Sequence, residues 1–385
     1  MTDESAAIAA RWQNYVMESG AQLDLFWQLH LAAQRDVLFI LGRGFDPRMC
    51  LGLRTVLAAG GGGKRDVWVV DFDEGPASPS KTYEPLVQAN WSELQRLVNG
   101  RGSVGEKRLR MWSDDGRRVG SRSAAGLVTA TGDLVGYSDI VLDVSALPRA
   151  IYFPLIAKVL HLLDEEQWQD GGARPPNLHV LVAENAKLDL RIRDEGIDET
   201  AGYVHPFGGG LEMEATADHP KVWIPVLGER QQAQLERIYD LVMPDEIAPL
   251  LPSPSVNPRR ADDLLLEYRE LLFDRLRVEP SNFIFAAERN PFEVYRQLRR
   301  AILHYREALQ PLGGCRAVLS ALSTKLLSVG ALLVAYELKR LKVEVGIAHV
   351  ECQGYTVDQD ATSEGDLSSE SELHGLWLWG ECYEP

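Results

Sequence analysis

Long hydrophobic runs are missing from this chain of 385 residues. The stretch Leu326–Tyr336 is among the longest, and it is far shorter than the roughly 20 apolar residues that a membrane-spanning helix needs. The first residues, Met1–Ser5, are acidic, whereas a secretory signal peptide begins with basic residues. The sequence therefore predicts no membrane span and a cytoplasmic location.

Cysteine is scarce, and positive charge is in deficit. The four cysteines are never closely paired, which disfavours a zinc knuckle or a disulfide framework and favours reduced thiols. His, Glu and Cys are too scattered along the chain to predict a metal site. A formal net charge of −16 disfavours an extended nucleic-acid surface, because such binding is driven by neutralising phosphates. Any anionic ligand must therefore find a local basic site.

One basic segment lies between Arg101 and Arg122, around the turn signal Asp114-Asp115-Gly116. The turn and its flanking residues predict a basic β-hairpin. Its positive charges either balance neighbouring acids or face a ligand, and both interpretations stay open. The basic residues that flank the turn are Lys107, Arg108, Arg110, Arg117, Arg118 and Arg122.

Short runs rich in Val, Ile, Leu and Phe alternate with segments of helical period. This pattern is typical of buried parallel strands joined by crossover helices. The predicted strands are Val37–Leu41, Val67–Val70, Ile140–Leu142, Leu178–Val182, Val222–Val226, Phe283–Phe285, Ala317–Leu319 and Val343–Ala348. The predicted fold class is α/β, with two Rossmann-like halves of mainly parallel sheets and flanking helices rather than an antiparallel sandwich.

The chain is expected to divide into four parts. These are N-terminal helices over 1–34, namely Ser5–Glu18 and Leu23–Ala33; a first Rossmann-like half over 35–215, with the basic hairpin inserted near 101–122; a second Rossmann-like half over 216–355; and, over 356–385, an acidic link followed by an apolar edge strand at Leu376–Trp379. The proline-rich segment Pro249–Arg260 is interpreted as the connection into the second half, because it cannot form a regular helix or a central strand.

An internal comparison suggests that the two halves are related. Leu38–Arg48 and Phe283–Phe292 each read as a strand, a short loop with an Asx-Pro pair, and a helix. Val141–Arg149 and Val318–Lys325 each read as a strand that ends in a small polar cluster before a long apolar helix. The repeat is weak but ordered, which indicates two similar halves.

Several of these polar turns are candidate binding sites, because ligands of open parallel sheets bind beyond the carboxyl ends of the strands. Gly42-Arg43-Gly44 leaves room for close backbone approach, and Asp46-Pro47 fits a helix start with Asp46 as N-cap. The turn suits a phosphate or carboxylate, although helix capping alone also explains Asp46. About 30 residues further on, Asp71 or Asp73 is positioned to hold a ribose.

The cluster from Asp143 through Ser145 to Arg149 has the form Asp-x-Ser-x-x-x-Arg and directly follows a predicted strand. It resembles the turn of the CRISPR-associated Rossmann-fold ligand-sensing (CARF) domains. Ser320–Lys325, which includes Ser323 and Thr324, is similar to the Thr-Lys turn of such domains, although its leading acid is missing. The resemblance implies a nucleotide or cyclic oligonucleotide ligand bound across a dimer interface, and a role in prokaryotic antiviral defence.

Three functions are compatible with these patterns. The first is a nucleotide-binding sensor or regulator, whose expected ligand-binding residues are Gly42, Arg43, Gly44, Asp46, Asp143, Ser145, Arg149, Asn290, Ser323, Thr324 and Lys325. The second is a Rossmann-fold enzyme that uses NAD or S-adenosylmethionine, with Asp46 or His205 of the glycine-rich loop Gly202–Glu214 as the acid–base group. The third is a scaffold subunit that docks on a protein partner through its C-terminal apolar strand.

Overall fold

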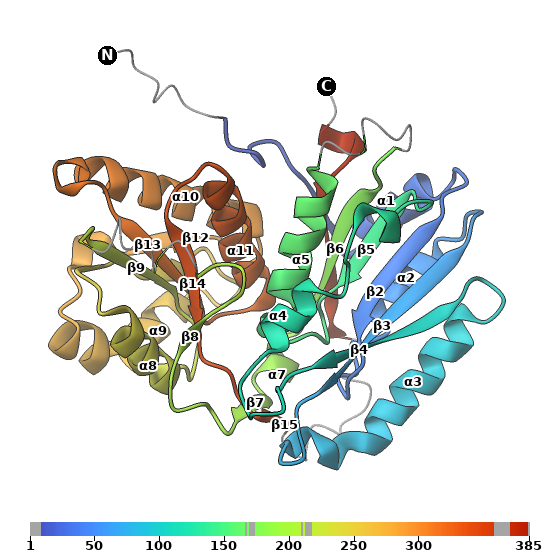
Figure 1. Cartoon of the computed structure of the whole chain (residues 1–385), viewed down its shortest axis with the longest axis horizontal. Coiled ribbons are helices and arrows are strands. Elements are labelled where there is room, and N and C mark those ends of the chain that lie inside the picture. The colour runs from blue at the N-terminus through green and yellow to red at the C-terminus, as the bar shows by residue number, and fades with distance from the viewer. Residues whose placement is uncertain are drawn as a thin grey trace. The chain divides into compact units, whose positions relative to one another are not determined.

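The computed structural model describes residues 9–165, 168, 174–208, 211, 218–357 and 370–383. Its described residues fall into two compact units. The first unit contains Val16–Asp198 and the described part of Glu351–Pro385, and the second contains the described parts of Met1–Tyr15 and Glu199–Val350. Each unit is built around its own sheet (Figure 1).

The first unit has a seven-stranded sheet in the order β1-β16-β6-β5-β2-β3-β4. Its strands are β1 (Val16–Ser19), β2 (Val37–Gly42), β3 (Arg65–Asp73), β4 (Val104–Arg110), β5 (Asp139–Asp143), β6 (Asn177–Glu184) and β16 (Glu372–Trp379). The strands from β4 to β6 are parallel, whereas β16 runs antiparallel to both β6 and β1. A separate antiparallel pair joins β7 (Ile192–Glu195) to β15 (Gly354–Val357).

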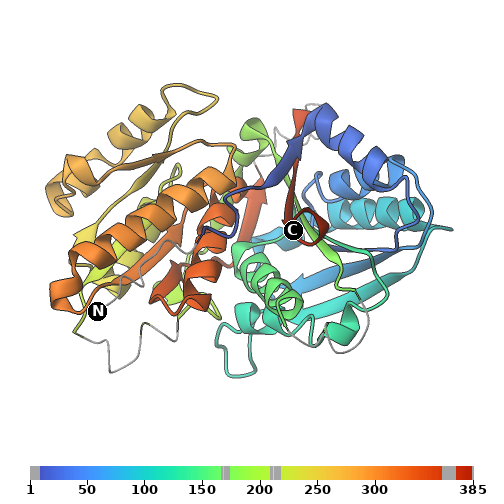
Figure 2. The ribbon, with the colours of Figure 1, turned by 90° about the horizontal axis from the view of Figure 1, so that it is seen from above.

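Helices cover both faces of this sheet. They are α1 (Gly20–His30), α2 (Leu51–Ala58), α3 (Glu84–Val98), α4 (Gly120–Ala125), α5 (Arg149–Leu163) and the short α7 (Ala186–Asp189). In Figure 2 the blue to cyan helices α1, α2 and α3 lie on one face and the green helix α5 lies on the other. Alternate residues of each strand supply the two faces, so that Phe39 and Leu41 of β2 join Trp27 of α1 and Leu53 of α2 in one apolar core.

The second unit has a sheet in the order β12-β11-β9-β13-β14-β8, with β10 also paired to β9. Its strands are β8 (Gly202–Tyr203), β9 (Lys221–Val226), β10 (Glu246–Ile247), β11 (Leu250–Pro252), β12 (Ile284–Ala286), β13 (Arg316–Ala321) and β14 (Val345–His349). All described pairings here are parallel except that of β8 with β14. The helices are α8 (Gln232–Val242), α9 (Arg260–Glu267), α10 (Pro291–Ala308) and α11 (Lys325–Arg340).

Local sequence explains where the longer helices of the second unit begin. Asn290 caps α10 with its side-chain oxygen, which accepts hydrogen bonds from the backbone N–H groups of Phe292 and Glu293, and Pro291 occupies the first helical position. Thr324 caps α11 in the same manner. Short helical turns complete the described chain at Pro79–Tyr83, Thr131–Asp133, Glu270–Arg275, Pro280–Asn282, Gln310–Leu312 and Glu381–Tyr383.

The predicted fold class is confirmed, because each unit has a largely parallel sheet with flanking helices. Each of the eight predicted strands lies within or overlaps an observed strand. Among the described residues, no helix combines the length and apolar character that crossing a membrane requires.

Three element predictions are wrong. The helix predicted over Ser5–Glu18 is replaced, in its described part, by a turn that leads into β1. The C-terminal strand β16 exists, but it is paired on both sides and is not an edge strand. The segment Pro249–Arg260 lies inside the second unit and contributes β11, a central strand whose proline is its last residue.

The parallel strands of the two sheets have the same spatial order. Numbered along the chain within each unit, they lie in the order third, second, first, fourth, fifth, with an antiparallel strand beyond the fifth. By this numbering β5 and β13, which carry the two small polar clusters, are both fourth strands. The comparison of Leu38–Arg48 with Phe283–Phe292, in contrast, pairs a first strand, β2, with a third strand, β12.

Candidate functional site

The glycine turn after β2 packs directly against the loop after β5. A Cβ atom at Gly42 would lie 2.5 Å from Leu147 Cδ2 and 3.1 Å from the carbonyl oxygen of Ala146, so only glycine fits without a shift of these neighbours. The amide nitrogen of Asn90 on α3 holds the same turn by donating to the carbonyl oxygens of Gly44 and Asp46. The predicted close backbone approach is therefore present, and its neighbour is the protein's own β5 loop.

Asp46 is not the N-cap of a helix, because α2 begins at Leu51. Its carboxylate instead accepts two hydrogen bonds from the buried guanidinium of Arg48, at 2.8 and 3.0 Å, and one from the Arg48 backbone N–H at 2.8 Å. Arg48 also donates to Asp189 at 2.8 Å. Burial alone would lower the pKa of Arg48, but the charges of Asp46 and Asp189 raise it above its usual range. Asp46 is thus engaged in a buried ion pair.

The remaining candidates of the first unit lie around the same loops. Asp143 and Ser145 are buried; Asp143 Oδ1 accepts from the Ser145 backbone N–H, and Ser145 Oγ accepts from the backbone N–H of Ala183 at 2.9 Å. Arg149 is the half-buried first residue of α5. Arg43 lies with its guanidinium 5.0 Å from the ring centroid of Trp91.

The candidates of the second unit lie at two helix starts. Asn290 caps α10 and donates from its amide nitrogen to the hydroxyl of Tyr15 at 2.8 Å. Ser323 is buried, and Thr324 and Lys325 are half-buried at the start of α11. Arg149 and Lys325 belong to different units. His205 is an exposed residue of the turn after β8, whereas Glu212 and Glu214 lie outside the described residues.

A cavity of about 560 Å³ lies at the carboxyl ends of β3 and β4 in the first unit. This volume is in the range of small-molecule sites, which span roughly 300–1,000 Å³. Counted along the chain, β3 is the second and β4 the third parallel strand of this sheet. Ligands of such sheets bind at the carboxyl edge, which is where the cavity lies. Its polar lining includes Asp71, Asp73, Glu74, Ser78, Arg108, Arg110 and Gln353.

Two acids and two arginines are neighbours on the adjacent strands that line this cavity. The parallel register places Asp71 opposite Arg108 and Asp73 opposite Arg110, on the same face of the sheet because the two positions are separated by two residues. Asp73 Oδ1 accepts from the Gly75 backbone N–H at 2.9 Å, and Arg110 forms an ion pair with the exposed Asp114. The cavity therefore offers both carboxylate acceptors and guanidinium donors.

The wall of the cavity is held by an indole and a half-buried arginine. The Trp112 indole N–H donates to the carbonyl oxygen of Glu74 at 3.0 Å, and the Arg118 guanidinium lies 3.8 Å from the Trp112 ring centroid. Arg118 in turn binds Asp198 through two hydrogen bonds of 2.8 and 2.9 Å and donates to the carbonyl oxygen of Cys352. These contacts fix the turn beyond β4 in place.

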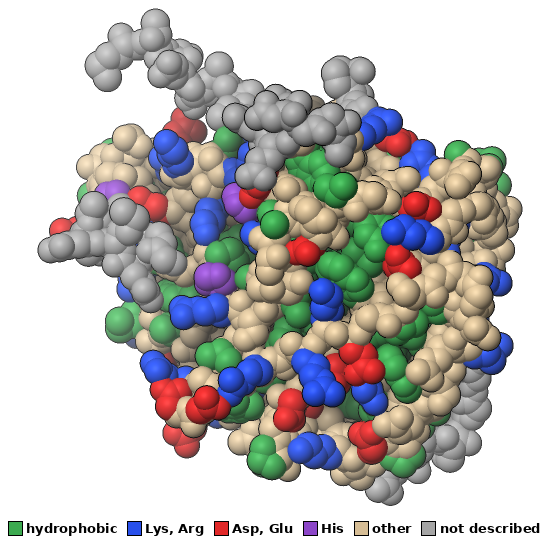
Figure 3. Space-filling view, turned by 45° about the vertical axis from the view of Figure 1, so that its right-hand side comes forward, with side chains coloured by type: hydrophobic (Ala, Val, Ile, Leu, Met, Phe, Trp, Pro, Cys, Tyr) green, Lys and Arg blue, Asp and Glu red, His purple; other side chains and the backbone are tan. Residues whose placement is uncertain are grey.

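The basic hairpin is shorter than predicted. Val104–Arg110 form the parallel strand β4, and antiparallel bridging is confined to Trp112 and Arg118, on either side of a turn that contains Gly116 with a φ of 77°. On the face in Figure 3, Lys and Arg side chains are interspersed with Asp and Glu. Within the basic segment, Arg117 balances a neighbouring acid, because it pairs with Asp115. Arg108 instead lines the cavity, where a ligand could reach it.

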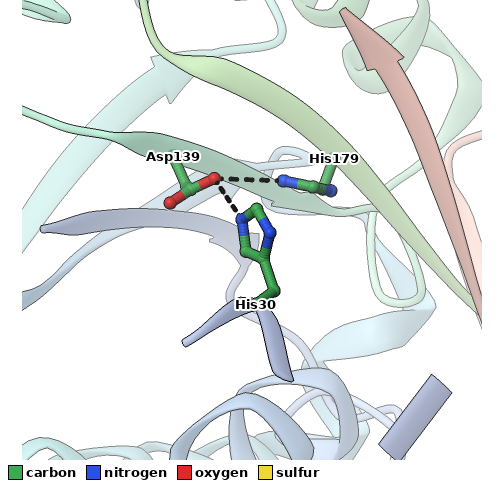
Figure 4. Close-up of side chains that lie close together, drawn as sticks. All are labelled: His30, Asp139 and His179. Carbon is green, nitrogen blue, oxygen red and sulfur yellow. Dashed lines mark hydrogen bonds and ion pairs between the residues drawn. The ribbon is translucent and has the colours of Figure 1, made fainter. Parts of the chain in front are cut away.

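Far along the chain from one another, His30, Asp139 and His179 meet in the first unit (Figure 4). Both imidazoles approach one carboxylate oxygen: the distance from Asp139 Oδ1 is 2.7 Å to His30 Nε2 and 3.2 Å to His179 Nε2. Burial alone would raise the pKa of Asp139, but hydrogen bonds from the two histidines lower it well below its usual range. Burial lowers the pKa of His179. Potential metal ligands that the sequence scatters widely are thus brought together by the fold, with their ligand atoms within 4.8 Å of one another.

Comparisons with known proteins give no family. No family model matches the chain, and no curated protein matches it. Among solved structures, a type III CRISPR defence DNA nuclease activated by cyclic oligoadenylate is similar at 10% identity and a TM-score of 0.43 over 80% of this chain, which spans 64% of the length of that protein.

Two further structures are similar over most of their length. The functionally unknown protein PA1789 from Pseudomonas aeruginosa PAO1 has 12% identity and a TM-score of 0.21, covering 90% of this chain and 99% of its own. An uncharacterised protein from Mycobacterium Paratuberculosis has 10% identity and a TM-score of 0.20, and the match covers 88% of this chain and 90% of that protein. At such TM-scores these likenesses carry no argument about what this chain binds.

Proposed function

We propose that this chain is a nucleotide-binding regulatory protein whose ligand occupies the cavity at the ends of β3 and β4. The observation that supports this function is that two acids and two arginines, on neighbouring strands, line one cavity at the carboxyl edge of a parallel sheet. In sheets of this order, an acid at the end of the second strand accepts hydrogen bonds from a ribose. Asp71 and Asp73 occupy that position.

The arginines complete the chemistry that a nucleotide needs. A guanidinium binds phosphate oxygens through charge-assisted, often paired, hydrogen bonds. Arg108 and Arg110 lie one strand beyond the two acids, where they would meet a phosphate carried on the 2′ position of a ribose held by Asp71 or Asp73. Regulation is proposed in preference to catalysis because Asp46, one of the two acid–base candidates, is held by Arg48 in a buried ion pair.

An enzyme that uses NAD or S-adenosylmethionine is the second candidate. Both cofactors carry a ribose, and the acids at the end of β3 suit them as well as a regulatory nucleotide. A scaffold function is not favoured. The C-terminal strand that was expected to dock on a partner is paired on both sides within the first unit.

The test measures binding to the full-length protein by calorimetry and thermal shift. The ligands are ATP, NAD, S-adenosylmethionine, a cyclic dinucleotide and a cyclic oligoadenylate, the last because of the resemblance of Asp143–Arg149 to CARF domains. We expect one of these classes to bind without turnover. Arg108→Ala should weaken binding by about 1.5–3 kcal/mol, the contribution of a hydrogen bond to a charged group.

Matched controls make the test specific to the cavity. Arg117→Ala removes a side chain that is 81% exposed in the same segment and should leave binding unchanged. Asp71→Asn should weaken binding of a ribonucleotide, because it replaces a carboxylate acceptor by an amide. Binding that is unaffected by Arg108→Ala and Asp71→Asn would contradict the proposed site. Consumption of NAD or transfer of a methyl group would favour the enzyme.

A further inference from the structure

We infer that His30, Asp139 and His179 form a binding site for a divalent transition-metal ion, for which zinc is the best match. The site is independent of the proposed nucleotide function. It lies at the opposite edge of the same sheet, because Asp139 is the first residue of β5 whereas the cavity lies at the carboxyl ends of β3 and β4. His30 is the last residue of α1, and His179 belongs to β6.

The ligand atoms are spaced for one ion. Imidazole nitrogen and carboxylate oxygen bind zinc at roughly 2.0–2.2 Å, so two ligands of a tetrahedral ion lie about 3.3 Å apart. His179 Nε2 is already 3.2 Å from Asp139 Oδ1, and His30 Nε2, at 2.7 Å, would move by about half an ångström. All three ligand atoms lie within 4.8 Å of one another, and both Nε2 atoms point at the same oxygen (Figure 4).

The surroundings exclude solvent on most sides. Asp139 is fully buried, and His179 is buried between Trp27 and Trp377, whose rings lie 5.0 and 4.9 Å from its own. A cavity of about 10 Å³ beside His179 is lined mainly by apolar side chains, among them Trp27 and Trp377, and by neither His30 nor Asp139. Three protein ligands and one water complete the four positions that zinc prefers.

Outer partners hold the carboxylate as they do in metal sites, where ligating carboxylates are themselves hydrogen-bonded. The Asn177 amide donates to Asp139 Oδ1 at 2.9 Å, and Arg35 lies 3.5 Å from Asp139 Oδ2. The positive charge of Arg35 is met by Glu381, which accepts two hydrogen bonds of 2.8 and 3.2 Å from it. Arg35 therefore shares its charge between two carboxylates and only partly neutralises Asp139.

An ion here would join three separate segments of the first unit. It would tie the end of α1 to the starts of two parallel strands, β5 and β6. Two imidazoles and one carboxylate suit Zn²⁺ and other first-row divalent ions, and are less suited to Ca²⁺ or Mg²⁺, which favour oxygen ligands. The expected role is therefore to stabilise the fold of the first unit.

The test is a titration of chelator-treated full-length protein with Co²⁺, followed by displacement with Zn²⁺. We expect one equivalent of Co²⁺ to bind with the visible absorption of a low-coordinate nitrogen and oxygen site, and Zn²⁺ to abolish it. His30→Gln and His179→Gln should each weaken Zn²⁺ affinity by at least about 100-fold, more than the loss of an outer partner causes. His161→Gln, in the same unit with a side chain that is 60% exposed, should bind as the wild type does.

Wild-type protein that takes up no stoichiometric Co²⁺ would overturn the inference, as would variants of His30 and His179 that bind Zn²⁺ as tightly as the wild type. Circular dichroism of each variant shows whether it is folded. Where a variant unfolds, the titration of the wild-type protein decides alone. A second readout is the melting temperature, which Zn²⁺ should raise in the wild type and in His161→Gln.

Discussion

The carboxyl edges of the two sheets differ although the strands lie in the same order. In the second unit, Arg260 at the start of α9 donates two hydrogen bonds to Glu229, at 2.6 and 2.8 Å, and one to Glu288 at 2.6 Å. This ion cluster joins the loops that follow β9 and β12 to the helix that follows β11. The corresponding edge of the first unit instead has a cavity at β3 and β4.

The difference shows that strand order alone does not make a binding site. In the second unit the positive charge sits on a helix start, where it reaches acids on the loops to either side. The first unit has a comparable ion cluster of Arg48, Asp46 and Asp189, and it has in addition two arginines on the outermost strand, β4, opposite the acids of β3. The first arrangement ties loops together, whereas the second lines an open space.

Both units nevertheless share one feature, a glycine after the first strand that lets this loop approach the loop after the fourth. A Cβ atom at Gly228 would lie 2.2 Å from the carbonyl oxygen of Leu322 and 2.7 Å from Ser323 Cα. At Gly42 the nearest obstacle is the side chain of Leu147, which can change its rotamer. The second unit is thus the less tolerant of the two at this position.

The largest expected effect follows from this contrast. Gly228→Ala should lower the free energy of unfolding by about 3 kcal/mol or more, because backbone must move to admit the methyl group, whereas Gly42→Ala should cost about 1–2 kcal/mol. Denaturant unfolding gives the magnitudes. Hydrogen exchange measured by mass spectrometry should show the loss of protection around β9 and β13 for Gly228→Ala and around β2 and β5 for Gly42→Ala. Equal effects of the two variants would contradict the contrast.

The next effect concerns the arginines. Arg260→Met should destabilise the second unit by about 2–3 kcal/mol, because the guanidinium is mostly buried and two carboxylates lose their partner. Arg108→Met should change stability by less than about 0.5 kcal/mol, as is usual for surface substitutions, while weakening nucleotide binding. A matching loss of stability in both variants would mean that Arg108 has a structural role.

The pH dependence of the Arg260→Met effect has a defined sign. Burial alone would raise the pKa of Glu229, but hydrogen bonds and charge from Arg260 lower it overall. A lowered pKa in the folded state contributes stability above the ordinary carboxyl pKa of about 4.3, and this contribution is lost as the pH falls through the folded value. The difference in unfolding free energy between the wild type and Arg260→Met should therefore shrink below about pH 4. A difference that stays constant to pH 3 would exclude this pairing as its cause.

The sequence predicts the fold well where strands are buried on both faces. Such strands read as continuous apolar runs, and all eight predicted runs are strands. Seven of the described strands lie outside the predicted runs, and two of these, β4 and β11, were missed for opposite reasons. The edge strand β4 alternates charged and apolar residues and resembled a hairpin arm, and the three-residue β11 was hidden among prolines.

The candidate site was predictable only in part. Asp71 and Asp73 were expected to hold a ribose because they end a strand, and the basic segment was recognised as a possible ligand surface. Sequence could not show that this segment pairs in parallel with β3, since its register depends on packing of residues 37 positions away. Two other features also depend on residues that are far apart in the sequence and were therefore missed. One is the hydrogen bond from the Trp112 indole to Glu74, and the other is the cluster of His30, Asp139 and His179.

Among the variants that we expect to lose stability, Trp112→Phe should lose the least, and it tests whether the Trp112 indole holds the cavity wall. Trp112→Phe removes the N–H that donates to Glu74 but keeps an aromatic ring beneath the guanidinium of Arg118. We expect a loss of about 1 kcal/mol in unfolding free energy, the net contribution of one hydrogen bond. Hydrogen exchange should rise in Glu74–Ser78 and stay unchanged around Arg260 in the second unit. Because the acids of β3 precede this segment, a looser wall should also weaken nucleotide binding, and binding that stays at the wild-type level would show that the wall does not shape the site.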